Sequence, residues 1–170
     1  SYAVAMSFGD FPRAVLAPGD VEEAFYLMGD AFNLAEEYQM PVVVLSDQHL
    51  ADSFATVAPF DLSRVEIKRG KVVQGSDAGA DYLRYRFTDD GISPRLYPGF
   101  GAGVVVSAGD EHDEQGHLIE DATARQKMME KRMAKLKLVE AVALEPVLCG
   151  ASEPDAMLIG FGSTKGAIAE

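Results

Sequence analysis

The chain has 170 residues, of which 48% are hydrophobic and 25% are charged, with a formal net charge of −12 and a single cysteine. This length and composition predict one hydrophobic core with at most a second partial unit. The negative charge argues against nucleic acid or an anionic membrane as a partner. One cysteine cannot build a disulfide framework, a cysteine zinc site or an iron–sulfur cluster, and this fits a reducing cytoplasm. No membrane-spanning run and no secretory signal are visible.

The first part of the chain predicts a strand, a helix and a second strand. Residues 14–17 (AVLA) form a short apolar run that a Pro-Gly pair ends, which indicates a buried strand. Asp20 and Glu23 form a capping box, and apolar residues at helical spacing predict a helix over 21–39. The β-branched run in 41–47 predicts a parallel strand covered on both faces. This order is typical of a βαβ unit with a right-handed crossover.

The middle of the chain is harder to interpret. Residues 47–57 indicate a short helix, and two short runs in 65–73 indicate a small hairpin. Residues 75–103 are loop-like, which is unusual in a compact domain unless the segment is functional or packs on a partner. An apolar run predicts a strand at 104–107, and an aspartate N-cap followed by an apolar stripe predicts a helix over 122–143.

Residues 109–117 read GDEHDEQGH and are called the acidic loop below. Three interpretations are open. His112, His117 and a carboxylate could bind zinc, although glycines on both sides leave two local histidines poorly preorganised. The segment could instead be a solvated acidic turn. It could also present charged groups at an interface or at the mouth of a site, because α/β folds place ligand contacts after the carboxyl ends of strands.

A basic stretch lies in the middle of the second long helix. Residues 125–137 contain a single acidic residue, Glu130. Their six basic residues are Arg125, Lys127, Lys131, Arg132, Lys135 and Lys137. A solvated amphipathic face explains this stretch most simply, and an acidic partner surface or an anionic cofactor tail is the sharper alternative. Cys149 has no local base and is expected to be an inert, partly buried thiol.

The C-terminal part restarts an α/β pattern. Residues 146–154 have the composition of a linker, 157–161 predict a strand, and a helix begins at Thr164. The turn GFGSTKG matches neither the phosphate-binding P-loop nor the dinucleotide-binding glycine pattern. Free amides make Ser163 and Thr164 a possible weak anion contact, but a tight strand-to-helix turn is the simpler interpretation.

Five segments in this order resemble one family. They are residues 9–53, 85–95 (YRFTDDGISPR), 109–117, 125–136 (RQKMMEKRMAKL) and 157–164 (MLIGFGST). Together they resemble the alpha subunit of 2-oxoacid:ferredoxin oxidoreductases, the family that contains the 2-oxoglutarate synthases. The resemblance covers nearly the whole chain, and the ordered set is more specific than any single motif in it.

The resemblance implies an enzyme that decarboxylates a 2-oxoacid, most simply 2-oxoglutarate, on thiamine diphosphate. It then forms an acyl-coenzyme A and passes electrons to ferredoxin. The implied fold is α/β, a parallel sheet flanked by helices of the pyrimidine-binding type. Residues 1–145 would be part of that domain, whose beginning is expected upstream, 146–154 a linker, and 155–170 the start of a transketolase C-terminal-like domain. Thiamine diphosphate and magnesium would lie at the interface with a separate beta subunit, and the iron–sulfur cluster in another subunit.

The glutamate that engages the aminopyrimidine in this family, and the basic stretch that meets the substrate carboxylate, are expected upstream of these residues. No catalytic residue and no metal ligand is therefore assigned here, and this segment alone is expected to be inactive. The resemblance implies that Asp110, His112, Asp113 and His117 lie on a surface loop that meets the beta subunit near the active-site mouth. A non-catalytic interaction module, or a metal-binding domain that uses residues 109–117, remains the alternative.

Overall fold

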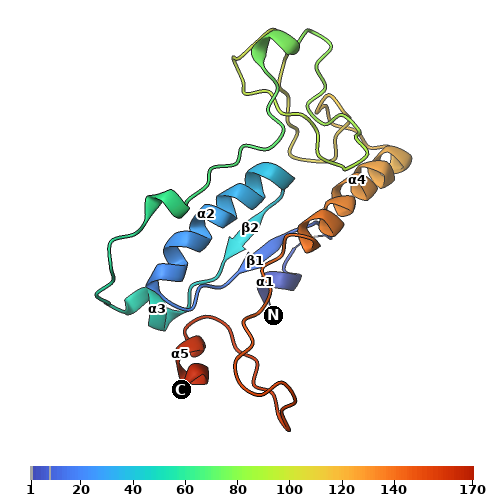
Figure 1. The fold of residues 1–170 in the computed structure, drawn as a ribbon. Coiled ribbons are helices and arrows are strands. Elements are labelled where there is room, and N and C mark those ends of the chain that lie inside the picture. Colours follow the sequence, from blue (N-terminus) through green and yellow to red (C-terminus); the bar gives the residue numbers. More distant parts are fainter. Residues whose placement is uncertain (1, 8) are drawn as a thin grey trace.

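The computed structural model describes residues 2–7 and 9–170 (Figure 1). Its helices and strands, in chain order, are α1 (Tyr2–Ala5), β1 (Ala14–Leu16), α2 (Val21–Tyr38), β2 (Val42–Val44), α3 (Gln48–Asp52), α4 (Ala122–Glu140) and α5 (Thr164–Ala169). In Figure 1, α2 lies over the two strands, irregular loops gather at the start of α4, and α5 lies near α3. Among the helices of the described residues, none combines the length and the apolar character that a bilayer crossing requires.

The predicted βαβ unit is present. β1 and β2 pair in parallel with Val15 opposite Val43, and the pairing continues where the amide of Leu45 donates to the carbonyl of Leu16 at 2.8 Å. The second strand was expected to be covered on both faces. That prediction is wrong for the described residues, because all three residues of β2 are only partly buried. Of the described helices, α2 is the one in extensive contact with both strands.

The long helix α2 begins and ends where local chemistry predicts. The carboxylate of Asp20 accepts from the amide of Glu23 at 2.8 Å, which satisfies one of the free donors of the first turn. The Glu23 carboxylate reaches one residue further back than in the usual capping box and accepts from the amide of Gly19 at 2.8 Å. The helix ends at Tyr38, and its C-cap Gln39 has a φ of 48°, in the left-handed region.

The second long helix, α4, has the predicted N-cap but a different buried face. The Asp121 carboxylate accepts from the amide of Ala124 at 2.7 Å. The predicted apolar stripe comprises Ala122, Met129, Met133, Leu136, Val139 and Ala143. None of these residues is buried, whereas Met128 and Lys135 are. The helix therefore packs through a face that includes Lys135, because the carbonyl of Gln39 at the end of α2 accepts from the lysine amine.

Three predicted β elements are wrong. Residues 104–107 and 157–161 contain no strand, and Leu158 and Ile159 are 80% and 89% exposed. A strand exists only when another strand pairs with it, and an apolar run cannot supply that partner. Residues 65–73 form no hairpin, because Val72 makes an isolated parallel bridge to Arg95 instead.

The loop-like segment 75–103 carries much of the core. Its regular structure is limited to a short 3-10 turn at Gly75–Asp77 and the single bridge at Arg95. Its buried residues nevertheless include Ile92, Ser93 and Leu96, at 6%, 2% and 1% exposure.

The short helices α3 and α5 confirm the helices predicted within residues 47–57 and from Thr164 onward. Cys149 is exposed, not partly buried as expected, because the linker around it is exposed throughout.

Candidate functional site

Asp113 folds the acidic loop back on itself. Its Oδ1 atom accepts from the amides of Gln115, Gly116 and His117, each at 2.9 Å. The amide of Asp113 also donates to the carbonyl of His117 at 2.9 Å. Burial acts to raise the pKa of Asp113, but these amides outweigh it and hold the pKa below the usual value. The Asp113 carboxylate is therefore largely used inside the loop.

Glu111 joins the acidic loop to α4. The terminal nitrogens Nη1 and Nη2 of Arg132 donate to the two carboxylate oxygens of Glu111, and Arg125 donates to Oε2 at 3.1 Å. The Glu111 side chain is only 9% exposed. Burial acts to raise its pKa, and the Arg132 hydrogen bonds more than offset that effect and lower it. Sequence reasoning missed this residue, although the seven-residue spacing of the two arginines places both on one face of the helix.

His112 lies inside the protein, contrary to the expectation of a surface loop. It is 8% exposed, and its ring packs against that of Tyr85, with 3.8 Å between the centroids and 33° between the ring planes. Its Nδ1 atom lies 2.9 Å from the carbonyl oxygen of Asp113. Contact with an aromatic ring and one hydrogen bond together allow an imidazole to be buried. Tyr85 lies 27 residues earlier in the chain, so no local pattern indicates that it would supply the second ring.

The remaining predicted residues of the loop are exposed. Asp110 and His117 lie at the surface, and His117 Nδ1 is 3.9 Å from an oxygen of Asp113. The structure does not bring these residues together with His112 as a set of ligands. In residues 2–7 and 9–170, no group of three or more His, Cys, Asp or Glu side chains is placed to hold a metal ion. The metal-binding interpretation has no support from this geometry.

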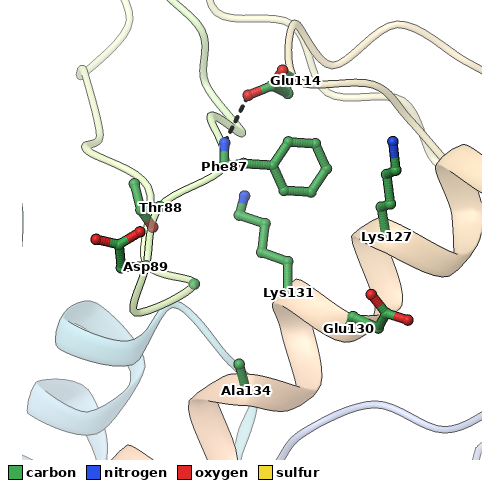
Figure 2. A pocket seen from close by; sticks show the side chains of 9 residues that line it. Phe87, Thr88, Asp89, Glu114, Lys127, Glu130, Lys131 and Ala134 are labelled. Carbon is green, nitrogen blue, oxygen red and sulfur yellow. Dashed lines mark hydrogen bonds between the residues drawn. The ribbon is translucent and has the colours of Figure 1, made fainter.

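An open hollow of about 480 Å³ lies between α4 and residues 87–91, with Glu114 of the acidic loop beside it (Figure 2). It is lined by Phe87, Thr88, Asp89, Gly91, Glu114, Lys127, Glu130, Lys131 and Ala134. The Glu114 carboxylate accepts from the amide of Phe87 at 2.7 Å, and the Glu114 carbonyl accepts from the amide of Tyr85 at 2.8 Å. The hollow is therefore bordered on one side by the segment that contains Tyr85 and Phe87, which Glu114 holds in place, and on the other side by α4.

Two lysines of α4 point inward. Lys131 donates to the carbonyl of Tyr85 at 2.7 Å and to the hydroxyl of Ser93 at 2.6 Å. Lys135, which is 8% exposed, donates to the carbonyl of Gln39 at 2.8 Å. Burial lowers the pKa of each lysine to about 8, and nearby cations add to the effect. The interpretation of residues 125–137 as a wholly solvated basic face is therefore wrong for these two.

The lowered pKa of Lys135 predicts a stability that rises with pH. Between about pH 8 and about pH 10.5 the unfolded chain binds a proton at this lysine that the folded chain does not, so unfolding becomes less favourable as the pH rises. We expect the melting temperature to increase between about pH 8 and about pH 9.5, and the increase to be smaller in Lys135→Met. The exposed Lys127→Met is the matched control. An equal pH response in the wild type and in Lys135→Met would contradict the assignment.

The terminal turn, residues 160–165, is held by carboxylates near the ends of β1 and β2. The amide of Ser163 donates to Asp47 Oδ2 at 2.7 Å. Thr164 makes no such contact, and its hydroxyl donates to the carbonyl of Phe161. Lys165 donates to Asp20 at 2.6 Å and to Glu23 at 2.5 Å. The anion that Ser163 meets is therefore a carboxylate of the chain itself.

Comparison with known proteins places this chain in a family. The model of the family described as "Pyruvate flavodoxin/ferredoxin oxidoreductase, thiamine diP-bdg" matches residues 2–131. The chain is 44% identical to 2-oxoacid:ferredoxin oxidoreductase 2, subunit alpha, of Aeropyrum pernix, over 99% of this chain and 26% of that protein. It is 33% identical to the 2-oxoglutarate synthase subunit KorA of Methanothermobacter thermautotrophicus, over 65% of this chain and 28% of that protein.

A solved structure agrees with these relatives. The 2-oxoglutarate:ferredoxin oxidoreductase from Magnetococcus marinus, with 2-oxoglutarate, coenzyme A and succinyl-CoA bound, matches with a TM-score of 0.73 and 34% identity. The match covers 82% of this chain and 24% of that one. The chain thus spans about a quarter of the length of the curated relatives named above. The resemblance noted in the sequence and the α/β fold class are confirmed. The chain belongs to the thiamine-diphosphate-binding domain family of the pyruvate flavodoxin/ferredoxin oxidoreductases, which is the family of the 2-oxoacid:ferredoxin oxidoreductase alpha subunits.

Proposed function

We propose that this chain is part of the alpha subunit of a 2-oxoacid:ferredoxin oxidoreductase. The whole enzyme would convert a 2-oxoacid and coenzyme A into an acyl-CoA and carbon dioxide, with two electrons passing to ferredoxin. The observation that carries this proposal is 44% identity to such an alpha subunit over 99% of the chain. The 2-oxoglutarate synthase relatives and the solved 2-oxoglutarate:ferredoxin oxidoreductase support 2-oxoglutarate as the substrate.

The proposed division into domains follows the sequence boundaries. Residues 1–145 form part of the pyrimidine-binding domain, 146–154 are the linker, and 155–170 begin a transketolase C-terminal-like domain. The family match over residues 2–131 supports the first unit. The exposure of every residue from 141 to 161 supports a linker in this region.

The described residues do not fit the diphosphate end of thiamine diphosphate. The amide of Ser163 is already bound by the Asp47 carboxylate, and the part of the chain that the structure describes holds no group of three or more metal-ligating side chains. We therefore assign thiamine diphosphate and magnesium to the interface with a beta subunit, and the iron–sulfur cluster to another subunit. Coenzyme A and ferredoxin are partners of the whole complex, which we place in the cytoplasm.

The acidic loop has two kinds of residues in this proposal. Glu111, His112 and Asp113 hold its shape through contacts within the chain. Asp110 and His117 are exposed and can meet the beta subunit near the active-site mouth. This assignment keeps the interface role for the loop and narrows it to the side chains that reach the surface.

Turnover of the complete enzyme tests the proposal. The full-length alpha subunit with its beta subunit should reduce ferredoxin with 2-oxoglutarate and coenzyme A, and more slowly with pyruvate. The double variant Asp110→Asn/His117→Ala should weaken beta-subunit affinity or turnover without a shift in melting temperature. Asp30→Asn, at an exposed position of α2 outside the loop and the hollow, is the control. Absence of 2-oxoacid-dependent reduction would refute the activity, and unchanged affinity and turnover in the double variant would refute the interface role.

A further inference from the structure

We propose that Lys131 is a self-acylation site, at which the side-chain amine takes an acyl group from a small acyl thioester. The inference rests on the proposed function for the source of the thioester, because an acyl-CoA is the product of that reaction. The amine, the hollow that it lines and the two acceptors that orient it all belong to this chain.

The contacts of the Lys131 amine leave room for its neutral form. A neutral amine has two hydrogens and one lone pair. Its two hydrogens can go to the carbonyl of Tyr85 at 2.7 Å and to the hydroxyl of Ser93 at 2.6 Å. The lone pair then occupies the remaining tetrahedral direction. Figure 2 shows the Lys131 side chain extending from α4 toward Phe87 among the residues that line the open hollow, and its amine lies 5.7 Å from the centre of the Phe87 ring.

The charges around Lys131 favour the neutral form. Burial lowers its pKa to about 8, and Lys135, Arg84 and Arg132 act in the same direction, while Glu114 opposes them. At about pH 8, roughly half of the Lys131 amines are neutral, compared with about 0.3% for a lysine at the ordinary pKa. Lys127, Glu130 and Asp89 also line the hollow. The neutral amine is the nucleophile, so this shift increases the population that can react.

The chemistry needs no oxidant and no further reactant. The Lys131 nitrogen attacks the thioester carbonyl and forms a carbon–nitrogen bond. The carbon–sulfur bond then breaks, the sulfur leaves with the electron pair as a thiolate, and it takes up the proton that the nitrogen loses. The products are an amide on Lys131 and a free thiol.

Acylation would change how α4 is held. An amide nitrogen carries one hydrogen, so it can serve only one of the two acceptors, Tyr85 or Ser93, and the other loses its donor. The acyl group would also occupy the hollow, and the positive charge would disappear. The modification would therefore loosen the contact between α4 and the segment around Tyr85 when the thioester accumulates.

Site-resolved labelling of the full-length protein tests the inference. Acetyl-CoA is added at a series of pH values, and the rate of acetylation of each lysine is measured by peptide mass spectrometry. We expect Lys131 to react at least about tenfold faster than Lys127 at about pH 7.5, and its rate to level off above about pH 8. Lys127 is the control for access, because it lines the same hollow and is exposed.

Lys135 is the control for basicity. Its pKa is also lowered to about 8, but it does not line the hollow and is 8% exposed, so it should stay unlabelled. Equal or slower labelling of Lys131 than of Lys127, or a rate that keeps rising tenfold per pH unit, would overturn the proposal. Because the thioester is added, this outcome is independent of turnover: an active enzyme without Lys131 labelling refutes only the acylation site.

Discussion

Replacing Gly116 with alanine is expected to lower the free energy of unfolding by about 3 kcal/mol or more. Gly116 has a φ of 96°, a backbone conformation that residues with a Cβ atom rarely adopt. An added Cβ would lie 2.1 Å from the carbonyl oxygen of Val106 and 2.7 Å from its carbon. The backbone cannot easily move away, because the carbonyl of Gly116 accepts from the amide of Ala108 at 3.1 Å.

Urea denaturation measures this effect, and Gly109→Ala is the matched control in the same loop. Gly109 has no heavy atom within 4 Å of the position that its Cβ would take, and its φ lies outside the left-handed region. We expect that change to stay within about 0.5 kcal/mol of the wild type. A Gly116→Ala protein as stable as Gly109→Ala would show that the acidic loop does not pack against residues 104–107 as described.

Replacing Glu111 with glutamine should cost about 2 kcal/mol of unfolding free energy. Glutamine keeps the size of the side chain but removes the charge that Arg132 and Arg125 share. Arg132 is 27% exposed and Arg125 is 60% exposed, so most of the loss comes from Arg132, whose charge would be left partly buried and unpaired. The lowered pKa of Glu111 also means that its contribution is present above about pH 4.5 and is lost as the pH falls further.

The control for this change is Glu120→Gln, at an exposed position a short distance along the chain. That substitution should shift the denaturation midpoint little, because surface charges away from strong partners contribute little to stability. The difference between the two variants at neutral pH should shrink in acid, where Glu111 is protonated in both states. If Glu111→Gln and Glu120→Gln behave alike at neutral pH, the ion pair does not hold the loop.

The helices of this fold were predictable because their signals are local. Asp20 and Asp121 lie within three residues of the amides that they cap, so the sequence shows both partners together. The prediction of strands at 104–107 and 157–161 was wrong, because an apolar run does not reveal whether a neighbouring strand exists to pair with it. Local apolar composition predicts burial in a sheet only when the sheet is present.

The candidate site divides in the same way. The turn at Asp113 is local, and its acceptor lies two to four residues from its donors. The burial of His112 depends on Tyr85, and the inward course of Lys135 depends on Gln39, a residue far away in the chain. The local sequence around a lysine in an amphipathic helix does not indicate whether its amine is solvated or donates to a carbonyl that is distant in the chain.

Asp20 and Asp47 are N-caps in which both carboxylate oxygens have partners. Asp20 uses Oδ1 to cap α2 and Oδ2 to hold Lys165, while Asp47 uses Oδ1 to cap α3 and Oδ2 to accept from the amide of Ser163. Serine, threonine and asparagine are also good N-caps, but each offers a single side-chain oxygen. None of them could direct one oxygen to the first turn of its own helix and a second oxygen to the terminal turn. The choice of amino acid at two positions early in the chain is thus dictated by a segment more than a hundred residues later.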